Sequence, residues 1–91
     1  MPVGRANRRE HREARVHAVF GEKTKPALDL IELTELAWHD VYEEISPSEE
    51  VIDDMLVVCG GTLDGLIRAA RLAVADWRDL RVSADAIRGR S

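Results

Sequence analysis

The chain has 91 residues, of which 45% are hydrophobic and 33% are charged, and its formal net charge is −4 at pH 7. This size predicts one domain, and the composition argues against a chain that is disordered throughout. No apolar run approaches the roughly 18 to 20 residues that span a bilayer, and the N-terminal residues lack the apolar run of a signal peptide. The single cysteine, Cys59, cannot form an internal disulfide, so we expect a cytoplasmic setting and no membrane partner.

Charge is sorted along the chain in three segments. Residues 1–25 carry seven bases and three acids, residues 26–62 carry ten acids and no base, and residues 63–91 carry six bases and four acids. The segments therefore have formal charges of +4, −10 and +2, which sum to −4. Such sorting predicts that the oppositely charged segments meet, either within one chain or between two.

The first predicted helix covers residues 7–20 and ends before Gly21. At 100° per residue, the arginines of this segment share an arc of about 120° with the large apolar residues Val16, Val19 and Phe20. These arginines are Arg5, Arg8, Arg9, Arg12 and Arg15. The face that docks is therefore also the basic face, which predicts internal or intersubunit pairing with the acids of residues 26–62. Two alternatives remain, a solvated arm and a contact for nucleic acid. The net negative charge and the few aromatic residues argue against nucleic acid as a partner.

The second predicted helix covers residues 26–45, with Pro26 in its first turn and Thr24 as a candidate cap. Apolar residues recur at helical spacing along it and predict one buried stripe, with the carboxylates on the opposite face. The stripe consists of Ala27, Ile31, Thr34, Trp38, Val41 and Ile45.

The third predicted helix covers residues 47–59 and begins at a capping box formed by Ser46 and Glu49. Gly60 and Gly61 end it, and Thr62 is the candidate cap of the helix that follows. Cys59 lies on the apolar face, where a thiol behaves as a small buried hydrophobic group.

The fourth predicted helix covers residues 62–88, and its apolar residues alternate in steps of three and four as in a coiled coil. We refer to these residues as the α-helical seam: Leu63, Leu66, Ala70, Ala73, Trp77, Leu80, Ala84 and Ile87. The first six of them are candidates for a subunit interface, and the alternative is the core of one small bundle. Because the seam is longer than the third helix beside it, the two interpretations are compatible, and we expect a homo-oligomer.

Two sets of side chains suggest a metal site. His39 has Glu35 and Glu43 one turn before and after it, with Glu32 nearby, and such neighbours can bind a divalent ion or can form a solvated face. The pairs Glu32/Glu35 and Glu50/Asp53, separated by fourteen residues, resemble the ExxE and ExxD motifs of MazG-type nucleotide pyrophosphohydrolases. That resemblance implies an all-α enzyme whose four carboxylates bind magnesium.

The length of the predicted hairpin bears on this resemblance. If the chain reverses at Ser46 and Pro47, the two pairs are offset by about 12 Å along the helices at 1.5 Å per residue. Magnesium takes oxygen ligands at about 2.1 Å, so the two pairs could share an ion only in a dimer or after an earlier end to the second helix.

The sequence therefore predicts an all-α protein: a small antiparallel bundle of three core helices in residues 26–91, with a basic helix or arm in residues 1–25. We interpret it as a self-associating protein–protein interaction module with no cofactor and with a possible further protein partner. The alternatives are a magnesium-dependent pyrophosphohydrolase and a nucleic-acid contact through the arginines of residues 1–25.

Overall fold

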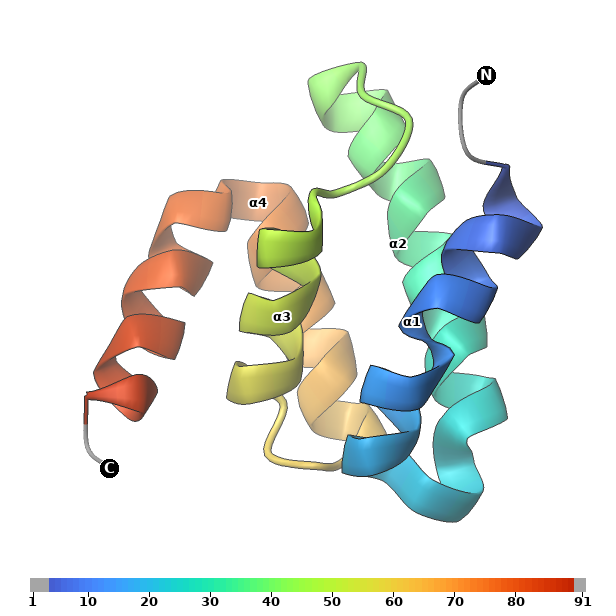
Figure 1. Ribbon diagram of the computed structural model, residues 1–91. Coiled ribbons are helices and arrows are strands. Elements are labelled where there is room, and N and C mark those ends of the chain that lie inside the picture. The colour runs from blue at the N-terminus through green and yellow to red at the C-terminus, as the bar shows by residue number, and fades with distance from the viewer. Residues whose placement is uncertain (1–3, 90–91) are drawn as a thin grey trace.

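The computed structural model describes residues 4–89, apart from the side chain of Arg5, and every regular element in that range is helical (Figure 1). The elements are α1 (Arg5–Phe20), the short 3-10 helix η1 (Gly21–Lys23), α2 (Thr24–Tyr42), α3 (Glu49–Val58) and α4 (Leu63–Arg88). Within this range no helix is both long and apolar enough to cross a membrane.

The junction between α1 and α2 forms at the glycine that the sequence identifies. Gly21 has a φ of 54°, and its N–H bonds to the carbonyl of His17, which ends α1. The predicted cap of α2 is wrong: the cap position is Lys23, without a side-chain bond, and Thr24 instead donates its hydroxyl to the Gly21 carbonyl at 2.6 Å. The two helices run in opposite directions and pack side by side (Figure 1).

Helix α2 ends at Tyr42, three residues before the predicted end at 45. Glu43 takes the left-handed conformation at a φ of 59°, and its N–H bonds to the His39 carbonyl. Ile45 thus lies outside the helix at 61% exposure, and Val41 is 53% exposed, so these two residues do not belong to the buried stripe.

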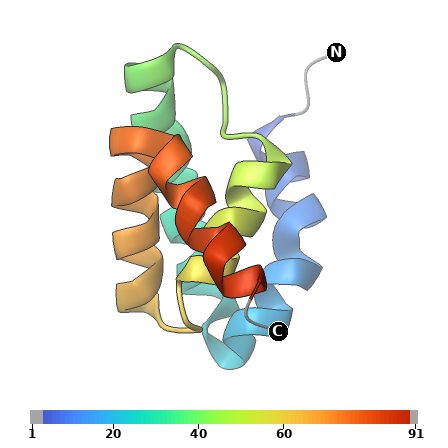
Figure 2. The same ribbon diagram turned by 90° about the vertical axis from the view of Figure 1, so that its left-hand side faces the viewer.

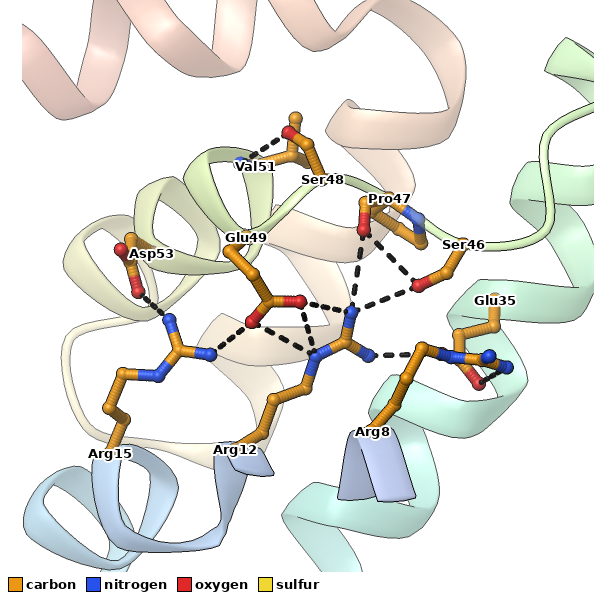
Figure 3. Close-up of polar contacts among 10 residues, drawn as sticks. All are labelled: Arg8, Arg12, Arg15, Glu35, Ser46, Pro47, Ser48, Glu49, Val51 and Asp53. Carbon is orange, nitrogen blue, oxygen red and sulfur yellow. Dashed lines mark hydrogen bonds and ion pairs between the residues drawn. The ribbon is translucent and has the colours of Figure 1, made fainter. Parts of the chain in front are cut away.

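Helix α3 begins later than predicted because a different serine caps it. The hydroxyl of Ser48, rather than that of Ser46, accepts from the Val51 N–H at 3.3 Å. The capping box with Ser46 is therefore wrong, since both of its proposed members bind an arginine of α1 (Figure 3).

The turn between α3 and α4 is tight. Gly60 and Gly61 have φ values of 67° and 78°, and Thr62 caps α4 as predicted, accepting from the Gly65 N–H at 2.9 Å. A Cβ atom on Gly65 would lie 1.8 Å from the Cys59 carbonyl oxygen, so only glycine fits where α4 begins.

Helix α4 breaks at Asp76, where φ is −163° and ψ is 97°. The Asp76 carboxylate accepts from the Arg78 N–H at 3.0 Å and thereby caps a second helical segment, which folds back over α3 (Figures 1 and 2). The continuous seam predicted over residues 62–88 is therefore interrupted. One chain buries much of both halves, because the second half returns along α3 instead of extending beyond it, while Ile87 near its end is 40% exposed.

The core includes residues from every α-helix. Among the most buried side chains are Val16 of α1, Ile31 of α2, Ile52 of α3 and Leu66 of α4, each at most 1% exposed. Cys59 is 2% exposed, as expected for a buried thiol. Helix α1 thus contributes to the same hydrophobic core as the other helices.

Candidate functional site

Arg8, Arg12 and Arg15 of α1 point toward acids of α2 and α3 (Figure 3). Arg12 is the most buried of them, with 2% of its side chain exposed. Its guanidinium donates to Glu35 at 3.0 Å, to Glu49 at 2.8 Å and to the Ser46 hydroxyl at 2.9 Å. It also donates to the Pro47 carbonyl at 3.4 Å. Arg12 thus joins α1, α2 and the chain leading into α3.

The neighbouring arginines make further pairs with the acidic segment. Arg8 donates to Glu35 at 2.5 Å. Arg9 lies 2.7 Å from Asp29 and 3.1 Å from Glu32, and Arg15 pairs with Glu49 and Asp53. These contacts, together with those of Arg12, form what we call the arginine interface. The side chain of Arg5 lies outside the described residues.

The interface changes the acidity of two of its carboxyl groups. Burial alone would raise the pKa of Glu35, but the hydrogen bond from Arg8 and the positive charges of Arg8 and Arg12 outweigh burial, so the pKa is lowered. Burial likewise acts to raise the pKa of Glu49, and Arg12 and Arg15 lower it overall. Both groups are therefore anionic at neutral pH and match the charge of the arginines.

The carboxylates proposed for magnesium are divided among different arginines. Glu32 lies against Arg9, Glu35 against Arg8 and Arg12, Glu50 against Arg81, and Asp53 against Arg15. In the described residues, no group of three or more histidine, cysteine, aspartate or glutamate side chains is placed to hold a metal ion. The earlier end of α2 does not bring the two motifs onto one ion.

The alternative set around His39 is also separated. His39 is exposed, and its Nδ1 lies 3.3 Å from the Glu44 carbonyl oxygen rather than next to a carboxylate. Glu43 forms the left-handed end of α2, whereas Glu35 is 3% exposed beneath α1. The three side chains thus have different environments.

Asp54 is a structural residue that was not predicted from the sequence. Its carboxylate is 2% exposed and accepts from Arg81 at 2.6 Å and from Arg88 at 2.8 Å. Both arginines belong to the second segment of α4, so Asp54 fixes that segment against α3. In the sequence, the four-residue spacing of Glu50 and Asp54 indicates that both lie on one helix face. Their arginine partners could not be identified in the same way, because they are brought to α3 only by the break of α4 at Asp76.

The proposed interface residues of α4 lie mainly inside the chain. Leu66, Ala73 and Leu80 have 0% exposure, Ala70 has 8%, and Leu63 and Trp77 are partly buried against the core. Most of their surface is used inside the chain, and a subunit contact through these residues stays a prediction.

A more exposed apolar face lies between α2 and the first segment of α4. An apolar groove of about 500 Å³ runs between these helices, which lie side by side at the left of Figure 2. Its lining includes Leu33, Val41 and Ile67, which are 62%, 53% and 43% exposed, and Leu36, also on α2, is 50% exposed. We call this the α2–α4 groove. Large apolar side chains grouped at this exposure are typical of an interaction surface.

Two charges near this groove make no ion pair among the described residues, in contrast to those of the arginine interface. Arg71 lines the groove, and Asp40 lies on the exposed side of α2 next to Val41. Neither makes an ion pair within the part of the chain that the structure describes.

Comparisons with protein-family models, curated proteins and solved structures find no match for this chain.

Proposed function

We propose that this small helical bundle is a protein–protein interaction module that self-associates through the α2–α4 groove. The observation that carries the proposal is the group of exposed apolar side chains, Leu33, Val41 and Ile67, that line one groove. Protein interfaces have apolar centres with few charges, and this surface has that composition. A chain of 91 residues also gains stability from a partner that covers such a surface.

The shape of the surface favours a protein over a small molecule. Small-ligand sites bury most of their ligand in a concave pocket. Here Leu33 and Leu36 extend apolar surface over the outer side of α2, with 62% and 50% of each residue exposed. A partner must therefore cover a broad face as well as fill the groove.

The other two functions considered have less support. A nucleic-acid contact needs arginines directed at phosphates, whereas Arg8, Arg9, Arg12 and Arg15 are paired with carboxylates of the same chain. A MazG-like reaction needs carboxylates that converge on magnesium, and the four candidates contact different arginines.

Sedimentation equilibrium of two matched variants tests the proposal. Leu33 and Val82 are both exposed apolar residues on helices, at 62% and 68%, but only Leu33 lines the groove. We expect Leu33→Asp to dissociate the protein and Val82→Asp to leave association unchanged, with little effect of either on folding because both side chains are exposed. A wild-type protein that is monomeric at about 50 µM, within the range of modest interfaces, would contradict the proposed function.

A further inference from the structure

We infer that Asp76 of α4 is a hinge, and that two copies of this chain exchange the part of α4 beyond it, residues 77–88. In the described chain the hinge is closed, and this segment packs on α3 of the same chain (Figures 1 and 2). In the exchanged dimer the hinge is open, and the segment of each copy packs on α3 of the other. The inference goes beyond the proposed function, because it uses a face of α3 that does not line the α2–α4 groove.

The first observation is that the residues around the break favour a continuous helix. Residues 66–88 contain no glycine or proline, which are common causes of sharp kinks in helices. The apolar spacing continues across the break at Ala73, Trp77 and Leu80. Asp76 is the residue of α4 with non-helical dihedral angles, and it is exposed. Helical angles at this one residue would extend the first segment by about 18 Å, at 1.5 Å per residue.

The second observation is that two side chains replace helical hydrogen bonds at the break. In a continuous helix, the N–H groups of Trp77 and Arg78 would bond to the carbonyls of Ala73 and Val74. In the closed hinge, the Arg78 N–H instead donates to the Asp76 carboxylate at 3.0 Å. The Tyr42 hydroxyl lies 3.1 and 3.0 Å from the two carbonyl oxygens. These two side chains therefore favour the closed hinge, and a continuous helix does not need them.

The third observation is that the segment is held by contacts that a second copy also offers. Asp54 of α3 is 2% exposed and accepts from Arg81 at 2.6 Å and from Arg88 at 2.8 Å. Leu80 and Ala84 of the segment are 0% exposed. Because the second copy has the same α3, the exchanged dimer repeats these contacts and differs from the closed chain mainly at the hinge.

The closed fold determines how the two copies lie in the dimer. The segment returns alongside α3 against the direction of the first segment of α4 (Figure 1). With the hinge open, it continues in the direction of the first segment, so the α3 that receives it belongs to an inverted copy. A two-fold axis perpendicular to α4 near Asp76 provides this arrangement and closes the dimer. Trp77 and Leu80, which were predicted as interface residues, would then lie between the copies.

Sedimentation equilibrium of full-length variants tests the hinge. Leu33→Asp is the background, because it removes association through the groove and leaves exchange as the route to a dimer. In this background Asp76→Ala removes the cap and should favour the open hinge about fivefold in each chain, so dimerisation should tighten about 25-fold. Tyr42→Phe should act in the same direction. The matched control is Asp85→Ala, the same substitution within the segment but away from the hinge, which should leave dimerisation unchanged.

A charge-swapped pair of chains tests the exchange itself. One chain carries Asp54→Arg, and the other carries Arg81→Asp with Arg88→Asp. Each chain alone has like charges between α3 and the segment, whether the hinge is closed or open. A heterodimer with exchanged segments restores opposite charges at both sites. We therefore expect a heterodimer when the two chains are unfolded together in urea and refolded, even if each folds poorly alone.

The outcomes separate this inference from the proposed function. Absence of the heterodimer, or an Asp76→Ala chain that is monomeric at about 0.5 mM, would overturn the exchange and leave the groove proposal unaffected. Insertion of Gly-Ser-Gly after Asp76 prevents a continuous helix and should abolish the exchanged dimer, so a dimer that survives it also counts against the hinge. If the wild type is monomeric at about 50 µM but the charge-swapped chains form a heterodimer, the proposed function is wrong and the exchange stands.

Discussion

The arginine interface and the α2–α4 groove use the same helix, α2, in opposite ways. On the side facing α1, Glu35 is 3% exposed and is held by two arginines. On the side facing the groove, Leu33 is 62% exposed, and the charge of Asp40 is unpaired within the described residues. A charged residue can thus hold the chain together, while an apolar one remains at the surface.

This difference separates stability from association. Four arginines of α1 have partners within the chain, so their loss should affect folding: Arg8, Arg9, Arg12 and Arg15. The groove residues have exposed surface and so should affect binding with little effect on folding. The predictions that follow begin with the most buried charges and end with the most exposed ones.

The largest effect is expected from Arg12→Met. Removing this guanidinium leaves Glu35 buried with fewer donors, and breaking a buried pair typically costs about 3 to 5 kcal/mol of the free energy of unfolding. Urea denaturation followed by circular dichroism measures this cost.

A second variant checks that explanation. Adding Glu35→Leu to Arg12→Met removes the uncompensated charge and should recover part of the lost stability. A double variant less stable than Arg12→Met would show that the cost comes from lost packing of the arginine stem instead.

An intermediate effect is expected at α3. The Asp54 side chain is 2% exposed and its carboxylate pairs with Arg81 and Arg88. Asp54→Asn removes this charge and should lower the free energy of unfolding by about 1 to 3 kcal/mol. The matched control is Glu50→Gln, because the Glu50 side chain is 80% exposed and pairs with the same Arg81. Its expected cost is below about 1 kcal/mol. Equal costs for the two variants would contradict the role of Asp54 in fixing the end of α4.

Acid should weaken the arginine interface gradually. The pKa values of Glu35 and Glu49 are lowered in the folded protein, so the unfolded chain binds protons more tightly. Their contribution is complete above the ordinary glutamate pKa of about 4.3 and is lost as pH falls through the lowered values. The free energy of unfolding measured in urea between pH 6 and 3 should decrease less steeply in Glu35→Gln than in the wild type, after allowance for its lower starting stability.

The smallest effect is expected from Arg9→Gln. The Arg9 side chain is 27% exposed and its partner Asp29 is 56% exposed, so the pair should contribute about 0 to 1 kcal/mol and weaken in salt. Comparing Arg9→Gln with Arg12→Met at low and high salt tests whether burial determines the size of each effect.

Deletion of residues 1–15 removes the buried Arg12 as well. We therefore expect it to lower the free energy of unfolding at every salt concentration.

The sequence by itself determined the features that depend on nearby residues. Glycines at 21, 60 and 61 mark two of the turns because they accept a positive φ, and Thr62 marks a helix start because its hydroxyl reaches a backbone N–H three residues later. The all-helical class and the buried position of Cys59 follow from apolar spacing. The sorting of charge also indicated that basic and acidic segments would meet.

Only the tertiary structure decided the features that depend on distant partners. Ser48 caps α3 because Ser46 and Glu49 bind Arg12, and a local pattern cannot show that competition. Asp76 interrupts α4 although the apolar spacing continues through it, because Asp54 of α3 holds Arg81 and Arg88 of the returning segment. The same return covers the predicted seam and leaves the α2–α4 groove as an exposed apolar face. Helical spacing identifies which residues share a face, but which face is covered depends on where the chain folds back.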